Sequence, residues 1–207
     1  MDEPNLVADR FGQILGVVHR ALSHFENVLN LVAGLLIAGL MFFGVVQIVT
    51  RTAFNAPIFG YIDIVELSMV GFAVLAISYV QREGGHVRME LLVSKLKGRW
   101  LWFVELLSSL VSIFIVAVLI PYSYQHFQRA FNIGDSTIDI ELATWPAKLV
   151  VPFALTVLLV RLVVQVAGYF RLLLSPNLNP VAIPLLKDVD TQAQEEIALS
   201  SSPDVKS

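Results

Sequence analysis

The side chains best able to do chemistry in this sequence are charged residues set within long apolar stretches. Arg161 lies ten positions before Arg171, roughly 15 Å along a helix from it and close to the middle of a membrane. An arginine at that depth is costly unless paired, and by default it indicates a functional position. Glu105, in the preceding apolar stretch, is the carboxylate that we expect to pair with Arg161, as a structural pair or one that faces a partner protein.

A second group of charged residues surrounds a short turn. Arg51 ends one apolar stretch, and Asp63 and Glu66 open the next. Between them lie residues that favour a tight turn, namely Asn55, Pro57 and Gly60. Arg51 can therefore pair with a carboxylate across the hairpin. We favour a structural clamp here over a role in contacting a solute.

Several kinds of chemistry are missing from the sequence. It has no cysteine, so it can form neither disulfides nor thiolate metal sites. It has no glycine-rich phosphate loop and no candidate pair of nucleophile and base. The four histidines lie outside or at the margins of the apolar stretches, where they cannot hold a haem between helices, and they are His19, His24, His86 and His126. We therefore expect no enzyme activity, no cofactor and no metal site.

The elements that must position these residues are membrane spans. Hydrophobic residues make up 56% of the chain and charged residues 15%, against about 25% charged in soluble domains. Stretches of roughly 20 residues with almost no charge are long enough to cross a bilayer. The sequence predicts an all-α integral membrane protein with four transmembrane helices, at about 28–50, 62–80, 100–124 and 147–170. A net charge of −3 argues against nucleic-acid binding.

The basic residues predict the orientation of these spans. If both termini are cytoplasmic, ten of the 14 Lys and Arg residues fall on the inside and three on the outside, with Arg161 in the membrane. The connection between the second and third spans alone carries five. Because basic residues favour the cytoplasmic side, we expect both termini to lie in the cytoplasm.

Segments of different character flank the four-span domain of residues 28–172. Residues 1–27 repeat apolar side chains at three- and four-residue steps, which predicts an amphipathic helix on the cytoplasmic surface of the membrane. A helix packed on a partner protein is the alternative. A second short interfacial helix is predicted after Gly84 and Gly85. Residues 173–207 contain prolines and a Ser-, Gln- and Glu-rich end, which predicts a disordered cytoplasmic tail.

The motifs together resemble a known family, the small permease subunit (DctQ type) of tripartite ATP-independent periplasmic (TRAP) transporters. The resemblance runs from about residue 28 to 172. It rests on the order of several short motifs: Arg51, Asn55, Pro57, Gly60, Glu66-Leu67, His86-Val87-Arg88-Met89-Glu90-Leu91-Leu92, Trp145-Pro146 and Pro152. The chain departs from the family pattern in having Asp63 as an additional acid near Glu66.

The resemblance implies a scaffold subunit in a bacterial inner membrane. Its partners would be membrane lipids, a large multi-span subunit that carries the solute path, and a periplasmic solute-binding protein. The transport would be driven by an ion gradient, with sodium expected, and would take up organic acids such as C4-dicarboxylates. The positions expected to be structural or to face a partner are Arg51, Asn55, Pro57, Glu66, His86, Arg88, Glu105, Trp145, Pro146 and Arg161.

Two other interpretations remain open at this point. One is a membrane anchor of a respiratory electron-transfer complex, which would require paired histidines or quinone-binding residues within the bilayer. The other is a small transporter that acts alone, with Arg161 lining a pore. A transporter of that kind usually shows internal repeats and broken helices with polar residues at the midplane, whereas these four spans are nearly featureless. We therefore favour the helper subunit.

Overall fold

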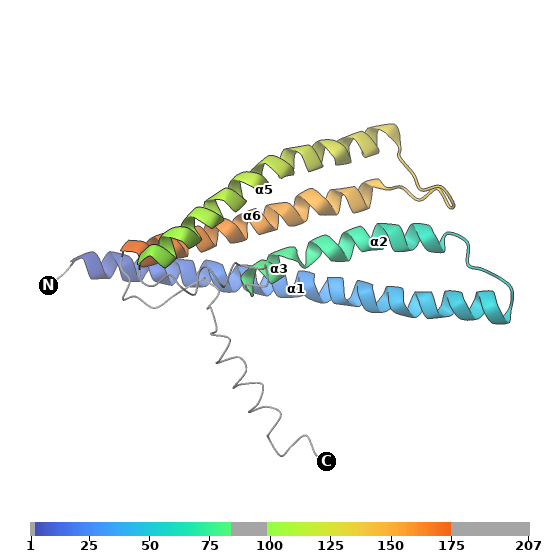
Figure 1. Cartoon of the computed structure of the whole chain (residues 1–207), viewed down its shortest axis with the longest axis horizontal. Coiled ribbons are helices and arrows are strands. Elements are labelled where there is room, and N and C mark those ends of the chain that lie inside the picture. The colour runs from blue at the N-terminus through green and yellow to red at the C-terminus, as the bar shows by residue number, and fades with distance from the viewer. Residues whose placement is uncertain (1–2, 84–98, 175–207) are drawn as a thin grey trace, which may run out of the picture.

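The fold is taken from a computed structural model, which describes residues 3–83 and 99–174. Helices dominate these residues, and an isolated bridge between Ser136 and Ala143 is the β-structure found there. The helices are α1 (Glu3–Ala53), α2 (Tyr61–Leu75), α3 (Ile77–Arg82), α5 (Arg99–Ile133) and α6 (Trp145–Leu174) (Figure 1).

The prediction of an all-α protein with four membrane-spanning helices is confirmed. Four helical stretches are long and apolar enough to cross a membrane, and α2 and α3 together form the second. They are Leu15–Ala53, Tyr61–Arg82, Phe103–Ile133 and Trp145–Arg171. Each is longer than the span predicted from charge alone, because the helices continue into their more polar ends.

The N-terminal segment is helical, but it is not separate from the first span. α1 runs without interruption through 51 residues, since no proline or turn sequence lies between the amphipathic repeat and the apolar run. The membrane-surface location of residues 1–27 stays a prediction. The interfacial helix predicted after Gly84 and nearly all of the predicted tail lie outside the described residues.

Two antiparallel hairpins form the bundle, α1 with α2 and α3, and α5 with α6 (Figure 1). Loops 54–60 and 134–144 lie at one end, which we call the loop end. Arg82 and Arg171 lie toward the other, which we call the terminal end. The hairpins approach each other at the terminal end and separate toward the loop end (Figure 1).

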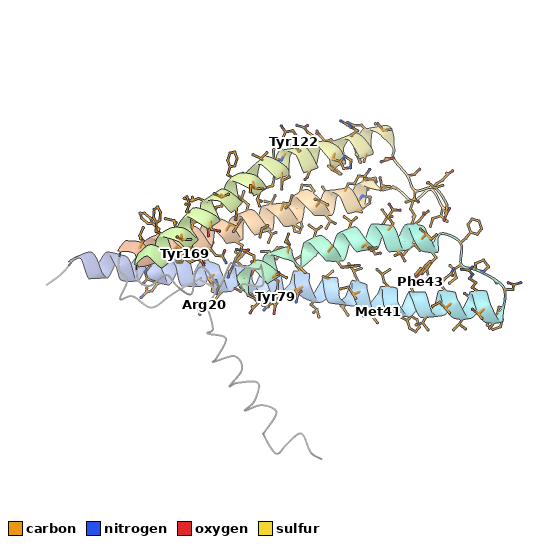
Figure 2. All side chains as sticks on the ribbon, in the orientation of Figure 1. Arg20, Met41, Phe43, Tyr79, Tyr122 and Tyr169 are labelled. Atoms are coloured by element: carbon orange, nitrogen blue, oxygen red, sulfur yellow. The ribbon has the colours of Figure 1, made fainter. Side chains whose placement is uncertain are left out.

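α6 is the central helix of the bundle. It packs against α1, α2, α3 and α5. In its apolar part half of the residues are buried, against 6% in α1. Its main apolar contact is with α5, where Val116 packs on Leu158 and Leu162. Nearer the terminal end, Leu15 of α1 packs on Val164. Most of the remaining apolar surface of α1 therefore faces outward, where side chains such as Met41 project away from the bundle (Figure 2).

Prolines occur both at the start of a helix and inside helices, the latter at Pro121 of α5 and Pro152 of α6. Pro146 is in the first turn of α6, where its missing N–H would have no partner within the helix. Pro152 lies inside α6, and the hydroxyl of Thr156 donates a hydrogen bond of 2.7 Å to the Pro152 carbonyl. The Trp145-Pro146 pair thus marks the start of α6, two residues before the predicted start of the fourth span at 147.

At the loop end, a contact between loop 134–144 and the start of α2 joins the two hairpins. The buried carboxylate of Asp63 accepts hydrogen bonds from the backbone N–H groups of Asp139 (3.1 Å) and Ile140 (2.9 Å). The Ile140 side chain lies over Gly60, so close that a Cβ at position 60 would be 2.5 Å from it. Gly60 also has a φ of +74°, which favours glycine. We call this contact the loop latch.

Replacing Gly60 by alanine should open the loop latch. We expect Gly60→Ala to destabilise the fold through backbone strain and through the clash with Ile140. Gly134→Ala is the matched control, because Gly134 has a φ of +72° but a Cβ placed on it would meet no atom within 4 Å. Since overpacking costs about 1–3 kcal/mol, thermal unfolding in detergent should show Gly60→Ala to be less stable than Gly134→Ala by that amount. Equal losses of stability in the two variants would show that the contact between Gly60 and Ile140 does not stabilise the fold.

Candidate functional site

Polar side chains are buried together where α1, α3 and α6 meet near the terminal end. Glu26 and Gln165 are 0% exposed, Arg161 is 1% exposed and Ser78 is 2% exposed. Burial of this kind is costly unless the charges are paired and hydrogen-bonded. We call the group the terminal polar cluster, and its members are His19, Glu26, Ser78, Gln81, Arg82, Arg161 and Gln165.

The Glu26 carboxylate is at the centre of the terminal polar cluster. The Ser78 hydroxyl donates a 2.7 Å hydrogen bond to its Oε1 atom. Arg161 Nε lies 3.9 Å from the same oxygen, and Arg82 Nη1 lies 3.6 Å from Oε2. One carboxylate on α1 thus faces two guanidinium groups, one from α3 and one from α6, which holds three helices together.

The remaining members of the cluster bind the guanidinium groups or each other. Arg161 Nη1 lies 3.0 Å from His19 Nδ1. Because a guanidinium only donates, Nδ1 must accept, which requires a neutral imidazole with its proton on Nε2. Arg82 also donates to the Ser23 carbonyl at 2.9 Å. Gln81 donates to Gln165 at 2.9 Å.

The cluster corrects the expected partner of Arg161. Among the described residues its ion pair is with Glu26 of α1, rather than with Glu105 of α5. Glu105 is buried and engaged elsewhere. Gln165 lies beside Gln81, near the end of the second span, and Arg161 is one helical turn farther from that end. The depth of Arg161 in the membrane stays a prediction.

Sequence reasoning missed Glu26 because it placed this residue outside the spans. The spacing of the buried residues along α1 nevertheless indicates that Glu26 is buried. Leu15, Leu22, Glu26 and Ala33 follow one another at seven- and four-residue steps. Such spacing puts all four on one helix face. A carboxylate within an apolar repeat predicts a buried partner of opposite charge.

At the loop end, the predicted turn residues lie in a turn, but the predicted pairing is wrong. Arg51 is exposed, and within the described residues it forms no ion pair with Asp63 or Glu66. Asp63 instead accepts the two backbone hydrogen bonds of the loop latch. The α1–α2 hairpin is closed by Gln47, whose Oε1 accepts a 2.8 Å hydrogen bond from the Ile58 N–H. The turn between them is formed through Asn55, with a φ of 53°, and Pro57.

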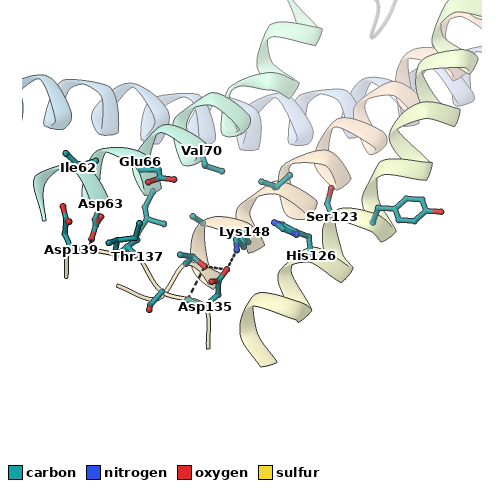
Figure 3. Close-up of a pocket in the computed structure, with 17 residues that line it drawn as sticks. Ile62, Asp63, Glu66, Val70, Ser123, His126, Asp135, Thr137, Asp139 and Lys148 are labelled. Atoms are coloured by element: carbon teal, nitrogen blue, oxygen red, sulfur yellow. Dashed lines mark hydrogen bonds and ion pairs between the residues drawn. The ribbon is translucent and has the colours of Figure 1, made fainter. Parts of the chain in front are cut away.

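The separation of the hairpins leaves a groove at the loop end, which we call the loop-end groove. Its volume is about 850 Å³. α2 from Ile62 to Val70 forms one wall and α5 from Tyr122 to His126 the other (Figure 3). α6, which packs against both, forms the floor with Lys148, and residues 135–139 of the loop close one end. Glu66, exposed on the α2 wall, faces this groove.

An ion pair holds the closed end of the groove. Lys148 Nζ on α6 contacts Asp135 Oδ2 in the loop, and Thr144 is a further hydrogen-bond partner of Asp135. The Lys148 ammonium, through its hydrogen bond and its charge, holds the pKa of the Asp135 carboxyl below its usual value. Asp135 and Lys148 are therefore both engaged with each other and not free for a ligand.

The other predicted site residues have separate places. Trp145 packs edge-on against Phe131, with ring centroids 5.7 Å apart, and so fastens the start of α6 to the end of α5. His86 and Arg88 lie outside the described residues. Within residues 3–83 and 99–174, no group of three or more His, Asp or Glu side chains is arranged to hold a metal.

Comparison with known proteins identifies one family. The family described as "Tripartite ATP-independent periplasmic transporters, DctQ component" matches residues 40–172, which is more than half of the chain. No curated protein and no solved structure shows significant similarity to the sequence. The matched region begins within α1 and ends near the end of α6.

Removing the Glu26 charge should destabilise the bundle more than removing both buried charges. Glu26→Gln leaves Arg161 without its carboxylate, and an unpaired buried charge of this kind costs about 3–5 kcal/mol. The double variant Glu26→Gln, Arg161→Leu should be more stable than Glu26→Gln alone. Thermal unfolding in detergent measures this, with the exposed Glu141→Gln as the control. Additive losses in the double variant would contradict the pairing.

The Asp135–Lys148 pair should give loop 134–144 a pH dependence in the acid range. Because the folded-state pKa of Asp135 is lowered, its contribution is complete above the unfolded value of about 3.9. The contribution is lost as the pH falls through the lower folded value. Asp135→Asn should therefore speed amide hydrogen exchange in the loop at pH 7. Below the folded pKa the variant and the natural chain should exchange alike, and a difference that persisted there would contradict the assignment.

Proposed function

Since the chain belongs to the DctQ component family of tripartite ATP-independent periplasmic transporters, we propose that it is the fixed membrane subunit of such a transporter. In this role it holds a large multi-span subunit that moves the solute. A periplasmic solute-binding protein delivers that solute. The family is a transporter component, and we propose no catalytic activity for this chain.

The terminal polar cluster is the observation that carries the scaffold role. Transport requires a protein to exchange between two arrangements of its helices, and each exchange must be accessible at modest free-energy cost. Here three helices share buried charges, so separating them would leave Glu26 or Arg161 unpaired in an apolar environment. The buried charges of the terminal polar cluster therefore hold α1, α3 and α6 in place, as a fixed scaffold requires.

The exposed surface of the bundle supports a role within a larger assembly. α1 buries little of its apolar length against the other helices. Lipid covers part of that surface, as it does for any membrane helix, and a partner subunit covers another part. The positions proposed to face a partner are Arg51 and Glu66 at the loop end. Asn55, Pro57, Trp145 and Pro146 have structural roles there, as Glu105 and Arg161 do within the bundle.

The direction of insertion follows from the basic residues. We place the loop end in the periplasm and both termini in the cytoplasm of a bacterial inner membrane, since Lys and Arg are concentrated at the terminal end. His86 and Arg88 then belong to the cytoplasmic connection. The transport we propose is ion-driven uptake, with sodium as the expected ion and organic acids such as C4-dicarboxylates as the expected solutes.

Co-purification from native membranes tests the scaffold function. The tagged chain, extracted in mild detergent, should bring down a much larger multi-span membrane protein in stoichiometric amount, because a scaffold is defined by that contact. Liposomes that hold both proteins should take up organic acid with a sodium gradient and the binding protein, whereas liposomes with this chain alone should not.

Two results would contradict the scaffold function. Recovery of a haem or flavin enzyme would make the chain a respiratory anchor, and a haem absorption band in the purified complex would identify it. Uptake by the chain alone in liposomes would make it an independent transporter. A tagged membrane protein of similar size from another family serves as the control for non-specific recovery.

A further inference from the structure

The loop-end groove contains a carboxylate that the fold itself leaves without a partner. Among the described residues, Glu66 has no hydrogen bond and no ion pair, although it lies on a membrane-spanning helix. It is five positions after Tyr61, so about 7.5 Å along α2 from the start of that helix. A carboxylate in such a place requires a cation or a polar cavity.

The other charges of the groove do not supply that cation. Asp63, one turn before Glu66, is hydrogen-bonded to the loop in the loop latch. Lys148 is paired with Asp135. His126 stands on the opposite wall from Glu66 (Figure 3). The Asp135–Lys148 pair is neutral overall and Asp139 is a further carboxylate in the lining, so the net charge facing the groove is negative.

The negative charge of the loop-end groove favours some kinds of ligand over others. An acidic groove repels anionic phospholipids, and in a zwitterionic phospholipid any cation of the head group brings a repelled phosphate with it. A helix has no such group, and it can present one Lys or Arg to Glu66 while its apolar side chains contact the walls. The walls also have apolar surface farther from the loop, for example at Leu67 and Val70 on α2. The undescribed segments adjoin the start of α1, the end of α3, the start of α5 and the end of α6, which lie toward the terminal end, whereas the groove is at the loop end (Figure 1).

We infer that the loop-end groove receives a helix of the partner membrane subunit, and that this helix pairs a Lys or Arg side chain with Glu66. The inference rests on the proposed scaffold function and adds to it the place and the chemistry of the contact. The groove lies between two hairpins whose relative position is fixed by the loop latch at one end and the terminal polar cluster at the other. It is therefore preformed, which lowers the entropy cost of docking.

Photo-crosslinking tests the place of the contact. A benzophenone amino acid at Val70 lies in the groove, and the same residue at Met41 lies on the exposed face of α1 outside it (Figure 2). In native membranes the Val70 position should crosslink to the multi-span partner with several times the yield of Met41. An equal or lower yield at Val70, or products at Val70 that contain only lipid or a second copy of this chain, would overturn the inference.

Charge variants test the chemistry of the contact. Since a hydrogen bond to a charged group is worth about 1.5–3 kcal/mol, Glu66→Gln should reduce recovery of the partner by about tenfold or more. Glu66→Lys should abolish it through repulsion. Exchange of the crosslinked partner's Lys or Arg for Glu should restore recovery with Glu66→Lys. The matched control is Glu141→Lys, an exposed carboxylate in loop 134–144 that does not line the groove.

The outcomes separate the two proposals. If the unchanged chain recovers no multi-span partner, the scaffold function is wrong. If it recovers the partner and the Glu66 variants recover it equally well, the scaffold function stands and the groove inference is wrong. Glu66 is exposed, so its variants should keep the thermal stability of the natural chain, and that measurement shows that any lost binding is not lost folding.

Discussion

The ion pair between Glu26 and Arg161 is the interaction on which the arrangement of this bundle depends. A charge buried away from water is strongly unfavourable alone, and the attraction between opposite charges compensates for that cost only at close range. Glu26 and Arg161 are almost fully buried and lie on α1 and α6, which are far apart in the sequence. The two helices must therefore meet at this point, and α3 joins them through Ser78 and Arg82.

A second polar contact works at the opposite end of the molecule. The loop latch satisfies the Asp63 carboxylate with two backbone N–H groups of the loop between α5 and α6. Apolar contacts alone orient membrane helices weakly, because lipid tails compete for the same surfaces. Polar contacts at both ends set the position of the hairpins relative to each other. The groove between them follows from that fixed separation.

This arrangement suits a subunit that holds another protein in place. Its buried charges make contacts within the bundle. Its exposed apolar faces and the loop-end groove remain accessible to lipid and to a partner. Glu66 differs from Asp63 and Asp135 in the groove, since the fold leaves it without a partner on a helix long and apolar enough to cross a membrane. A family of tripartite transporters supplies a reason for such a residue, because its partner can come from another chain.

The helical fold, the four spans and the family could all be predicted from the order of the amino acids. Runs of uncharged residues predict spans because a bilayer excludes charge, and Asn55 and Pro57 predict the turn through their own backbone preferences. Those signals are local. The packing of the helices, by contrast, was needed to establish that Glu26 pairs with Arg161, that Asp63 binds the loop and that Glu66 is left free. The spacing on α1 indicates that Glu26 is buried, but it does not say which helix supplies the partner, because that depends on how helices distant in sequence align.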